Sequence, residues 1–369
     1  MSKVSKKLFY TGSSNLLVPS RRSVLGGVAA FLAAPAVIRS TALGAGQVIV
    51  RTPGGAYSDA IIPTIYDPFT KETGIKVVLV PATIGKLWAM FRSGNIELDV
   101  IDTDQVVLYT LEREGALADI AYDKWKTVKP EDIDASVRTK QFAGHIYFSW
   151  VMTYNRDVFP EGKAPKNWAE FWDVKRFPGA RTLPDIASGQ PPLEFALLAD
   201  GVPMDKLYPL DLDRAFKSLD RIRPSVAKFW DTGAVSAELL SSKEVALGAL
   251  WSARVQPLVD SNFPVSIEWN QAMYTGMGYS IFKGAQNMEN AQRLIEFASR
   301  ADLMAEFLTR FPYGSAVPKA MDLMSPEALA RLPTTTERRS KAFPLDIVWW
   351  YENRPKVNDR WSKWLLASR

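Results

Sequence analysis

Cysteine is absent from this 369-residue sequence, and histidine occurs once, as His145. The absence of cysteine excludes disulfides, thiolate metal sites and a thiol nucleophile. A single histidine excludes a multi-histidine metal cluster and leaves one candidate imidazole base. We expect His145 to be a turn or hydrogen-bonding residue rather than a base. The sequence therefore predicts no metal site, no cofactor and no catalytic residue.

Long apolar runs are also missing from the body of the chain. After residue 46 no stretch of about 18 or more apolar residues occurs, so we expect no membrane span there. Hydrophobic residues nevertheless make up 47% of the sequence, which is sufficient for well-packed cores. The length is enough for two domains.

The net charge of +5 is unevenly distributed. Residues 1–46 contain no acidic residue and hold six of the 45 basic ones, namely Lys3, Lys6, Lys7, Arg21, Arg22 and Arg39. The remainder carries 39 basic against 40 acidic side chains, a net charge near −1. A nearly neutral body has no electrostatic reason to bind nucleic acid.

Residues 1–46 have the features of an export signal. A basic segment leads to the pair Arg21-Arg22, a modestly apolar run follows from Val24 to Ile38, and small residues gather at 42–46. The arginine pair and the glycines that follow it resemble a twin-arginine (Tat) signal, the route that exports folded proteins. The alternatives are the Sec route, an amphipathic N-terminal helix and a membrane anchor.

Strands and helices are expected to alternate in the first part of the body. Apolar runs predict strands at 47–51, 75–80 and 98–102, and helical patterns predict helices at 58–73, 84–93 and 106–114. This order favours a parallel sheet with right-handed crossovers.

The rest of the chain is less regular. We expect a strand at 147–154, a Pro- and Gly-rich tract at 177–192, and an apolar run at 245–251. A flexible strand at 273–282 contains Gly276 and Gly278. Helices are expected at 193–199, 212–229, 289–300, 302–311 and 349–366.

Several segments, in order along the body, resemble the family 1 extracellular solute-binding proteins of ABC importers, nearest to the spermidine/putrescine-binding branch. They are FTKETGIKV at 69–77, LDVI at 98–101, REGAL at 113–117, NWAEFW at 167–172, VALGALW at 245–251, FPYG at 311–314 and SPEA at 325–328. Each motif is short, but the matches run in order over nearly all of residues 47–369.

The resemblance implies an α/β, two-lobed periplasmic-binding-protein fold (type II) with two crossover strands and a ligand cleft. Lobe I would comprise 47–150 and 279–318, and lobe II 151–278 and 319–369. The crossovers are expected near Val151–Asn155 and Gly276–Ser280. The alternating pattern agrees, because an open parallel sheet binds ligands at the carboxyl ends of its strands.

Candidate ligand-binding residues come from loops at those strand ends and from aromatic side chains. The set is Thr52, Gly54, Gly55, Tyr57, Asp102, Thr103, Asp104, Trp150, Asp185, Trp251, Arg254 and Tyr274. Asp104 is equally suited to cap the helix that begins near Val106. The resemblance implies a ligand-stacking tryptophan at Trp251, for which core packing is the alternative. Arg254 could meet a carboxylate or phosphate, or lie on the surface.

The nature of the solute stays open. Polyamine binders of the family use several acidic residues, whereas here only Asp185 falls near the acid pair and the segment 273–278 has no acid. Burying a cationic ammonium without a carboxylate is costly. A smaller amine, an amino-acid-like zwitterion or another organic solute fits at least as well as a polyamine.

The resemblance implies a periplasmic monomer that pairs with the transmembrane permease subunits of an ABC importer, and the N-terminal segment predicts that it is exported by the Tat route. Two rival functions remain. One is an exported enzyme that uses carboxylate chemistry, although no nucleophile elbow, P-loop or zinc motif occurs in the sequence. The other is a ferric-iron-binding member of the same fold. Such proteins usually offer adjacent tyrosines to the iron, whereas the nearest aromatic cluster here, at 349–351, contains a single tyrosine, Tyr351.

Overall fold

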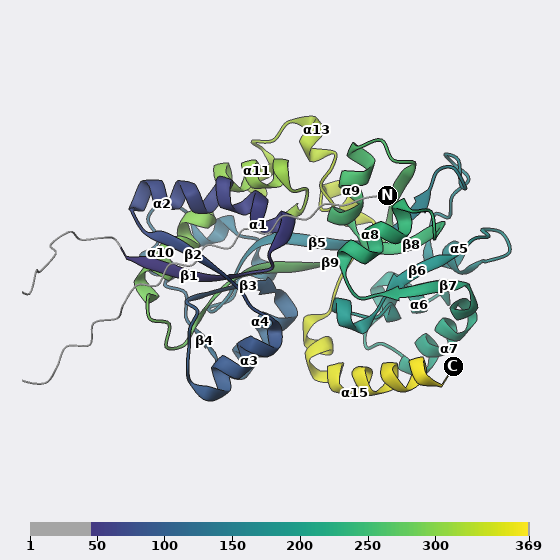
Figure 1. Cartoon of the computed structure of the whole chain (residues 1–369), viewed down its shortest axis with the longest axis horizontal. Coiled ribbons are helices and arrows are strands. Elements are labelled where there is room, and N and C mark those ends of the chain that lie inside the picture. The colour runs from purple at the N-terminus through teal and green to yellow at the C-terminus, as the bar shows by residue number, and fades with distance from the viewer. Residues whose placement is uncertain (1–45, 368–369) are drawn as a thin grey trace, which may run out of the picture. The chain divides into compact units, whose positions relative to one another are not determined.

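A computed structural model describes residues 46–367 (Figure 1). The predicted export signal, with Arg21 and Arg22, lies outside these residues. The described residues form an 11-stranded sheet. Its strands are β1 Gln47–Thr52, β2 Lys76–Pro81, β3 Val100–Asp104, β4 Leu117–Ala118, β5 Ala143–Asn155, β6 Arg181–Pro184, β7 Val226–Trp230, β8 Leu247–Trp251, β9 Val265–Phe282, β10 Gly314–Ser315 and β11 Phe343–Pro344.

Helices flank the sheet on both sides. They are α1 Gly55–Ile61, a π-helical turn at Ile62–Tyr66, α2 Asp67–Thr73, α3 Ile84–Ser93, α4 Gln105–Arg113, α5 Trp168–Trp172, α6 Leu193–Ala199, α7 Leu212–Ile222, α8 Gly233–Ser241, α9 Ser252–Asp260, α10 Met288–Ala298, α11 Ala301–Arg310, α12 Pro318–Met321, α13 Pro326–Leu329, α14 Thr336–Ser340 and α15 Ile347–Leu366. None of the helices among residues 46–367 is long and apolar enough to cross a membrane.

The strand–helix alternation predicted for residues 47–114 is confirmed. β1 pairs in parallel with both β2 and β3, and helices connect these strands. Gly74 and Gly94 end α2 and α3 in the left-handed conformation, with φ of 72° and 70°. Glycine is the residue that adopts this conformation at least cost, so the sequence itself specifies where these two helices stop.

Two long antiparallel strands connect the two ends of the sheet. The strand order is β2-β1-β3-β9-β5-β8-β6-β7, and β9 pairs with β5 from Ala143↔Tyr279 to Asn155↔Val265. In Figure 1, β5 and β9 run from the group containing β1 to the group containing β6. These are the two crossover strands that the resemblance implied.

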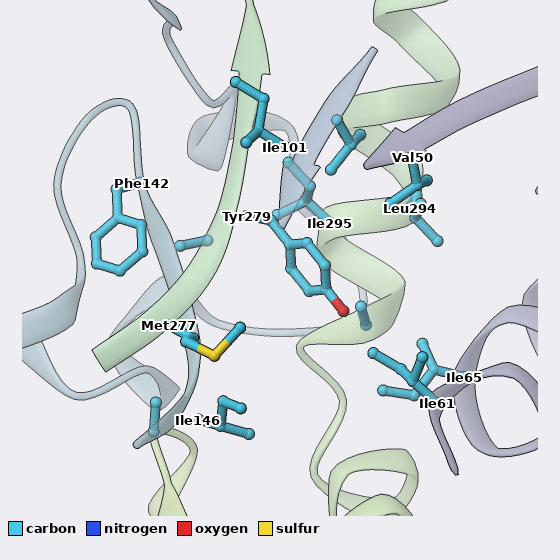
Figure 2. Packing of buried hydrophobic residues seen from close by; sticks show 14 of the residues in the cluster. Val50, Ile61, Ile65, Ile101, Phe142, Ile146, Met277, Tyr279, Leu294 and Ile295 are labelled. Carbon is cyan, nitrogen blue, oxygen red and sulfur yellow. The ribbon is translucent and has the colours of Figure 1, made fainter. Parts of the chain in front are cut away.

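The first hydrophobic cluster surrounds the β1 end of the sheet. Figure 2 shows side chains from the strands meeting those of α10 and the π-helical turn; they include Val50, Ile65, Ile101, Tyr279, Leu294 and Ile295. All six are at most 1% exposed. Burial of such apolar side chains is the main free-energy term that favours this half of the fold.

The second hydrophobic cluster is rich in aromatic side chains. Trp168 stacks on Phe195 with ring centroids 4.0 Å apart, and Trp230, Trp350 and Trp361 are fully buried in the same cluster. Along β5, Ile146 and Tyr147 belong to the first cluster, whereas Trp150 and Met152 belong to the second. The two cores therefore meet within β5 at residues 147–150, slightly before the predicted crossover.

The C-terminal region contributes to both clusters. Ala320 and Leu332, which the sequence prediction grouped with lobe II, pack in the first cluster. Phe343, Trp350 and Trp361 pack in the second.

The prediction of one helix was wrong at its C-terminal end. The predicted helix at 212–229 stops at Ile222, a 3₁₀ turn occupies Arg223–Ser225, and residues 226–230 form β7, which pairs in parallel with β6. Pro224 has no N–H to donate and its ring clashes with the preceding turn, so the helix cannot continue through it.

Glycines in the two crossover strands serve close packing. Gly278 of β9 lies opposite Gly144 of β5, and a Cβ on Gly278 would overlap Phe142 and the carbonyl of Ala143. A Cβ on Gly276 would lie 2.6 Å from Val137. The sequence suggested a flexible strand here, but both glycines are buried where neighbouring chain segments approach closely.

We predict that Gly278→Ala destabilises the protein by about 1–3 kcal/mol, because the added methyl group overpacks the contact with Phe142. The matched control is Gly85→Ala in α3, where the nearest atom to a new Cβ is Thr83 Oγ1 at 3.8 Å. We expect this control to be neutral or stabilising by up to about 1 kcal/mol. Urea unfolding measures both variants, and equal stability of the two would contradict the packing role.

Candidate functional site

A cavity of about 600 Å³ lies between the two hydrophobic clusters. Its lining comes from β1, α1, α3, β3 and α4 of the first half and from the 186–190 segment, β8, α9 and α15 of the second. The lining residues are Arg51, Pro53, Gly54, Tyr57, Ile84, Trp88, Thr103, Asp104, Val106, Val107, Thr110, Phe148, Trp150, Ile186, Ala187, Ser188, Gly189, Gln190, Trp251, Arg254, Met277, Tyr313 and Arg354. This volume suits a small organic molecule.

Seven of the twelve predicted site residues line the cavity: Gly54, Tyr57, Thr103, Asp104, Trp150, Trp251 and Arg254. They come together because the carboxyl ends of β1 and β3 reach the same edge as β8. The other five, Thr52, Gly55, Asp102, Asp185 and Tyr274, lie outside the lining.

Aromatic rings form one wall of the cavity. Trp251 makes edge contacts with Trp150 at 6.3 Å and with Phe148 at 6.3 Å between ring centroids. Trp230 packs against Trp251 at 5.2 Å and donates its indole N–H to the carbonyl of Ala249. Trp251 therefore both packs on the second core and presents a surface to the cavity, so the two alternatives stated for it are compatible.

Positive charge predominates in the cavity. Its lining contains three arginines, Arg51, Arg254 and Arg354, and one carboxylate, that of Asp104. Burial lowers the pKa of the Arg51 guanidinium, and the carboxylates of Asp102 and Asp104 partly oppose that shift. Burial likewise lowers the pKa of Arg354. An anionic group on a ligand would therefore be stabilised here.

Asp104 caps a helix and lines the cavity as well. Its Oδ1 accepts hydrogen bonds from the N–H groups of Val106 at 3.0 Å and Val107 at 3.1 Å, at the start of α4. The predicted capping role is confirmed.

A buried hydrogen-bonded group lies directly behind the cavity wall. Tyr57 donates its hydroxyl to Asp102 Oδ2 at 2.5 Å, and His145 Nε2 lies 3.1 Å from both Asp102 Oδ1 and the Tyr57 hydroxyl. The three side chains are at most 2% exposed. Burial raises the pKa of Tyr57 well above its ordinary value, so this phenol stays protonated and remains a donor. His145 is the hydrogen-bonding residue that the sequence suggested.

Comparison with known proteins decides the family. Residues 64–334 match the family described as bacterial extracellular solute-binding protein. The chain belongs to this family.

Individual relatives of this solute-binding protein span most of its length. It is 27% identical to a gamma-aminobutyric acid-binding protein of Pseudomonas aeruginosa, covering 84% of this chain and 88% of that protein. It is 25% identical to a spermidine/putrescine-binding periplasmic protein of Escherichia coli, covering 73% and 79%. The crystal structure of an ABC transporter substrate-binding protein from Bradyrhizobium japonicum superposes with a TM-score of 0.79 at 32% identity, covering 86% and 99%.

The family assignment confirms the predicted two-lobed fold and the predicted function. This solute-binding protein captures a small organic solute between its two lobes and delivers it to the permease of an ABC transporter. The relatives support neither the enzyme nor the ferric-iron alternative. Among the described residues, no group of three or more His, Asp or Glu side chains is arranged to hold a metal ion.

The five predicted site residues outside the cavity lining hold neighbouring parts of the solute-binding protein in place. Thr52 is buried and its hydroxyl lies 2.6 Å from that of Ser58, and Gly55 is the first residue of α1. Asp185 caps a 3₁₀ turn through the N–H of Ala187 and accepts from the indole of Trp361. Tyr274 packs edge-on against Tyr147 at 5.8 Å.

Two cationic residues of the cavity were missed from the sequence. Arg51 follows the apolar core of β1, and Arg354 lies in the third turn of α15, within the segment recognised only as aromatic. Neither position carries a motif, and about 300 residues separate the two in the chain. Three other aromatic residues, Tyr147, Trp269 and Tyr351, lie outside the cavity lining.

We predict that Asp102→Ala destabilises the protein by about 2–4 kcal/mol, because it leaves the Tyr57 hydroxyl and His145 Nε2 buried without their acceptor. The control is Asp205→Ala, an exposed position that we expect to change stability by less than about 0.5 kcal/mol. Chemical denaturation provides the comparison. An Asp102→Ala variant as stable as the control would show that these hydrogen bonds contribute little.

Proposed function

We propose that the solute is a small amino-acid-like molecule that carries a carboxylate and an amine. The observation that carries this proposal is the cavity lining, which combines three arginines, one aspartate and flat indole surfaces in about 600 Å³. Arginine matches a carboxylate, while the aromatic faces suit methylene groups and an ammonium. The relative that binds gamma-aminobutyric acid supports this class of solute.

A polyamine fits the same lining poorly. Each buried ammonium of a polyamine needs a carboxylate partner, and Asp104 is the single carboxylate in the lining. The similarity to the spermidine/putrescine-binding protein also covers less of this chain than the similarity to the gamma-aminobutyric acid-binding protein, at 73% against 84%. We therefore propose that polyamines are not the main cargo.

Binding and release proceed without chemical change to the solute in this proposal. The two lobes are the halves built around the first and second hydrophobic clusters, and they close over the solute by bending of β5 and β9 where the two cores meet. A bound solute stabilises the closed form through contacts with both lobes. The protein acts as a monomer that binds no nucleic acid, and it docks on the permease from the periplasm.

Export by the twin-arginine route completes the proposal. The motif that supports it is Arg21-Arg22, followed by an apolar run and by small residues at 42–46. The cysteine-free body needs no oxidative folding after export, so it can fold before it crosses the membrane.

We predict that gamma-aminobutyric acid, at about 100 times its dissociation constant, stabilises the protein by about 2.7 kcal/mol in a thermal-shift measurement. Trp251→Ala removes most of this stabilisation, because the indole forms the wall of the cavity. Trp269→Ala, which changes a tryptophan outside the cavity lining, retains it. No response to any small carboxylate or amine in the wild type would contradict the proposed class of solute.

We also predict that replacing Arg21 and Arg22 together by lysine abolishes export of the full-length chain, since the twin-arginine route depends on this pair. Cell fractionation of a tag-free protein measures the periplasmic share. A paired Lys6 and Lys7→Arg control keeps the motif and remains exported. Undiminished export of the Arg21/Arg22 variant would show that another route is used.

A further inference from the structure

A third segment joins the two halves beside the crossover strands. Residues 330–345, here called the strap, leave the first hydrophobic cluster at Leu332 and enter the second at Phe343. The short strand β11 at the end of the strap pairs with β9 through Phe343↔Met273. The strap therefore runs along one of the two strands that connect the halves.

β9 is irregular where the strap meets it. The register between β9 and β5 shifts between Trp150 and Met152, where residues 269–272 of β9 stand opposite the single residue Val151. Gln271 in this bulge has a φ of 59°, a left-handed conformation that is uncommon outside glycine. A bulge bends its strand and interrupts the hydrogen-bonded ladder. β9 is therefore least regular close to the point where the two cores meet.

Contacts from the strap hold this bulge. Gln271 donates its N–H to the carbonyl of Lys341 at 2.7 Å. The guanidinium of Arg338 lies 3.9 Å from the ring centre of Trp269, a favourable cation–π contact, and two carbonyls of the strap accept hydrogen bonds from the same side chain. These contacts hold the irregular part of β9 against the strap.

Another arginine anchors the strap to the first half. Arg339 donates from Nη1 to Asp134 Oδ2 at 3.0 Å, and its guanidinium lies 5.0 Å and 5.3 Å from the ring centres of Tyr147 and Tyr274. Burial alone would raise the pKa of the Asp134 carboxyl, but hydrogen bonds from Ser136 and Arg339 lower it to about 2. The carboxylate is therefore charged at neutral pH, and this part of the strap is fixed.

Arg331, at the start of the strap, joins the two halves directly. It donates from Nη1 to the carbonyl of Thr309 at 2.9 Å and from Nη2 to Asp260 Oδ2 at 2.5 Å. Thr309 belongs to α11, which packs in the first cluster through Leu308, whereas Asp260 ends α9, which packs mainly in the second through Val255. The helix dipole disfavours a carboxylate at a helix C-terminus, so Asp260 depends on a cation from outside α9.

A second contact between the halves lies on the other side of the crossover strands. Tyr109 of α4 meets Tyr351 of α15 edge-on, with 5.4 Å between the ring centroids. Figure 1 shows α4 and α15 on one side of β5 and β9, and α9 and α11 on the other. In this conformation residues of both halves line one cavity. A bond that joins the halves here and breaks when they separate favours this conformation over a more open one.

We propose that Arg331 and Asp260 are positioning residues for solute binding, because their ion pair holds the two halves in the conformation in which both line the cavity. This inference rests on the lobe closure proposed above and adds the groups that set its equilibrium. Neither residue lines the cavity, so both act only through the share of molecules that is competent to bind. Since the pair is partly exposed, its loss weakens binding by about 3–5-fold.

The experiment measures affinity and the separation of the halves in the same variants. Arg331→Gln and Asp260→Asn each remove one partner, and the charge swap Arg331→Glu with Asp260→Lys restores an ion pair. The control Arg310→Gln removes an ion pair that lies within α11. Calorimetric titration with gamma-aminobutyrate gives the affinity. Pulsed electron paramagnetic resonance of spin labels on cysteines introduced at Lys71 and Lys217 gives the distance between the halves, with and without solute.

We expect each single variant to bind about 3–5-fold more weakly than wild type and to show fewer short distances in the absence of solute. The double variant Arg331→Gln with Asp260→Asn is no weaker than either single variant, because both lose the same interaction. The charge swap recovers part of both losses, and Arg310→Gln behaves as wild type.

Each contrary result has a distinct meaning. Single variants with wild-type affinity and wild-type distances would overturn the role of the ion pair and leave the proposed function intact. Weaker binding with unchanged distances and no recovery in the charge swap would overturn it as well, because it would indicate a local structural defect. If wild type binds no gamma-aminobutyrate, that solute is wrong, and the solute-free distances still decide the role of Arg331 and Asp260.

Discussion

The pairing of β5 with β9 is the constraint on which the rest of the structure depends. These antiparallel strands bond to each other from Ala143↔Tyr279 to Asn155↔Val265 and pass from one hydrophobic core into the other. Buried glycines allow the close contact at one end, where Gly144 faces Gly278. Because the sheet is continuous through this pair, the carboxyl ends of β1 and β3 are held opposite β8 and α9, and a cavity remains between the cores.

The charge distribution in that cavity follows from how each polar group is held. Asp102 lies behind the wall, where its carboxylate accepts from Tyr57 and its backbone carbonyl accepts from Arg51. A single buried residue thus fixes both an aromatic and a cationic side chain of the site. Asp104 is committed to the start of α4, whereas Arg254 has no such commitment among the described residues.

Local sequence signals were enough to predict the first half of the fold and much of the site. Apolar runs, glycines that end helices and the carboxyl ends of strands are each encoded within a few residues. The elements from β1 to α4 could therefore be predicted, and so could the positions of Tyr57 and Asp104 at the cavity. Features that depend on partners far away in the sequence could not be predicted from local patterns. Arg354 reaches the cavity only because α15 packs on the second core, and Tyr274 faces Tyr147 because of the β5–β9 register. The predicted helix at 212–229 included β7, because no local signal shows the partner strand β6. Pro224 ends the helix, and pairing with β6 makes residues 226–230 a strand.

The central claim is that two lobes close over a solute held between them, and the cysteine-free sequence makes that motion directly measurable. Cysteines introduced at the exposed positions Lys71 of α2 and Lys217 of α7 place one spin label on each half. Pulsed electron paramagnetic resonance then gives the distance distribution with and without saturating gamma-aminobutyrate. A broad distribution that becomes shorter and narrower on binding is the predicted result. An unchanged distribution, with binding verified in the same sample, would contradict closure of the two lobes.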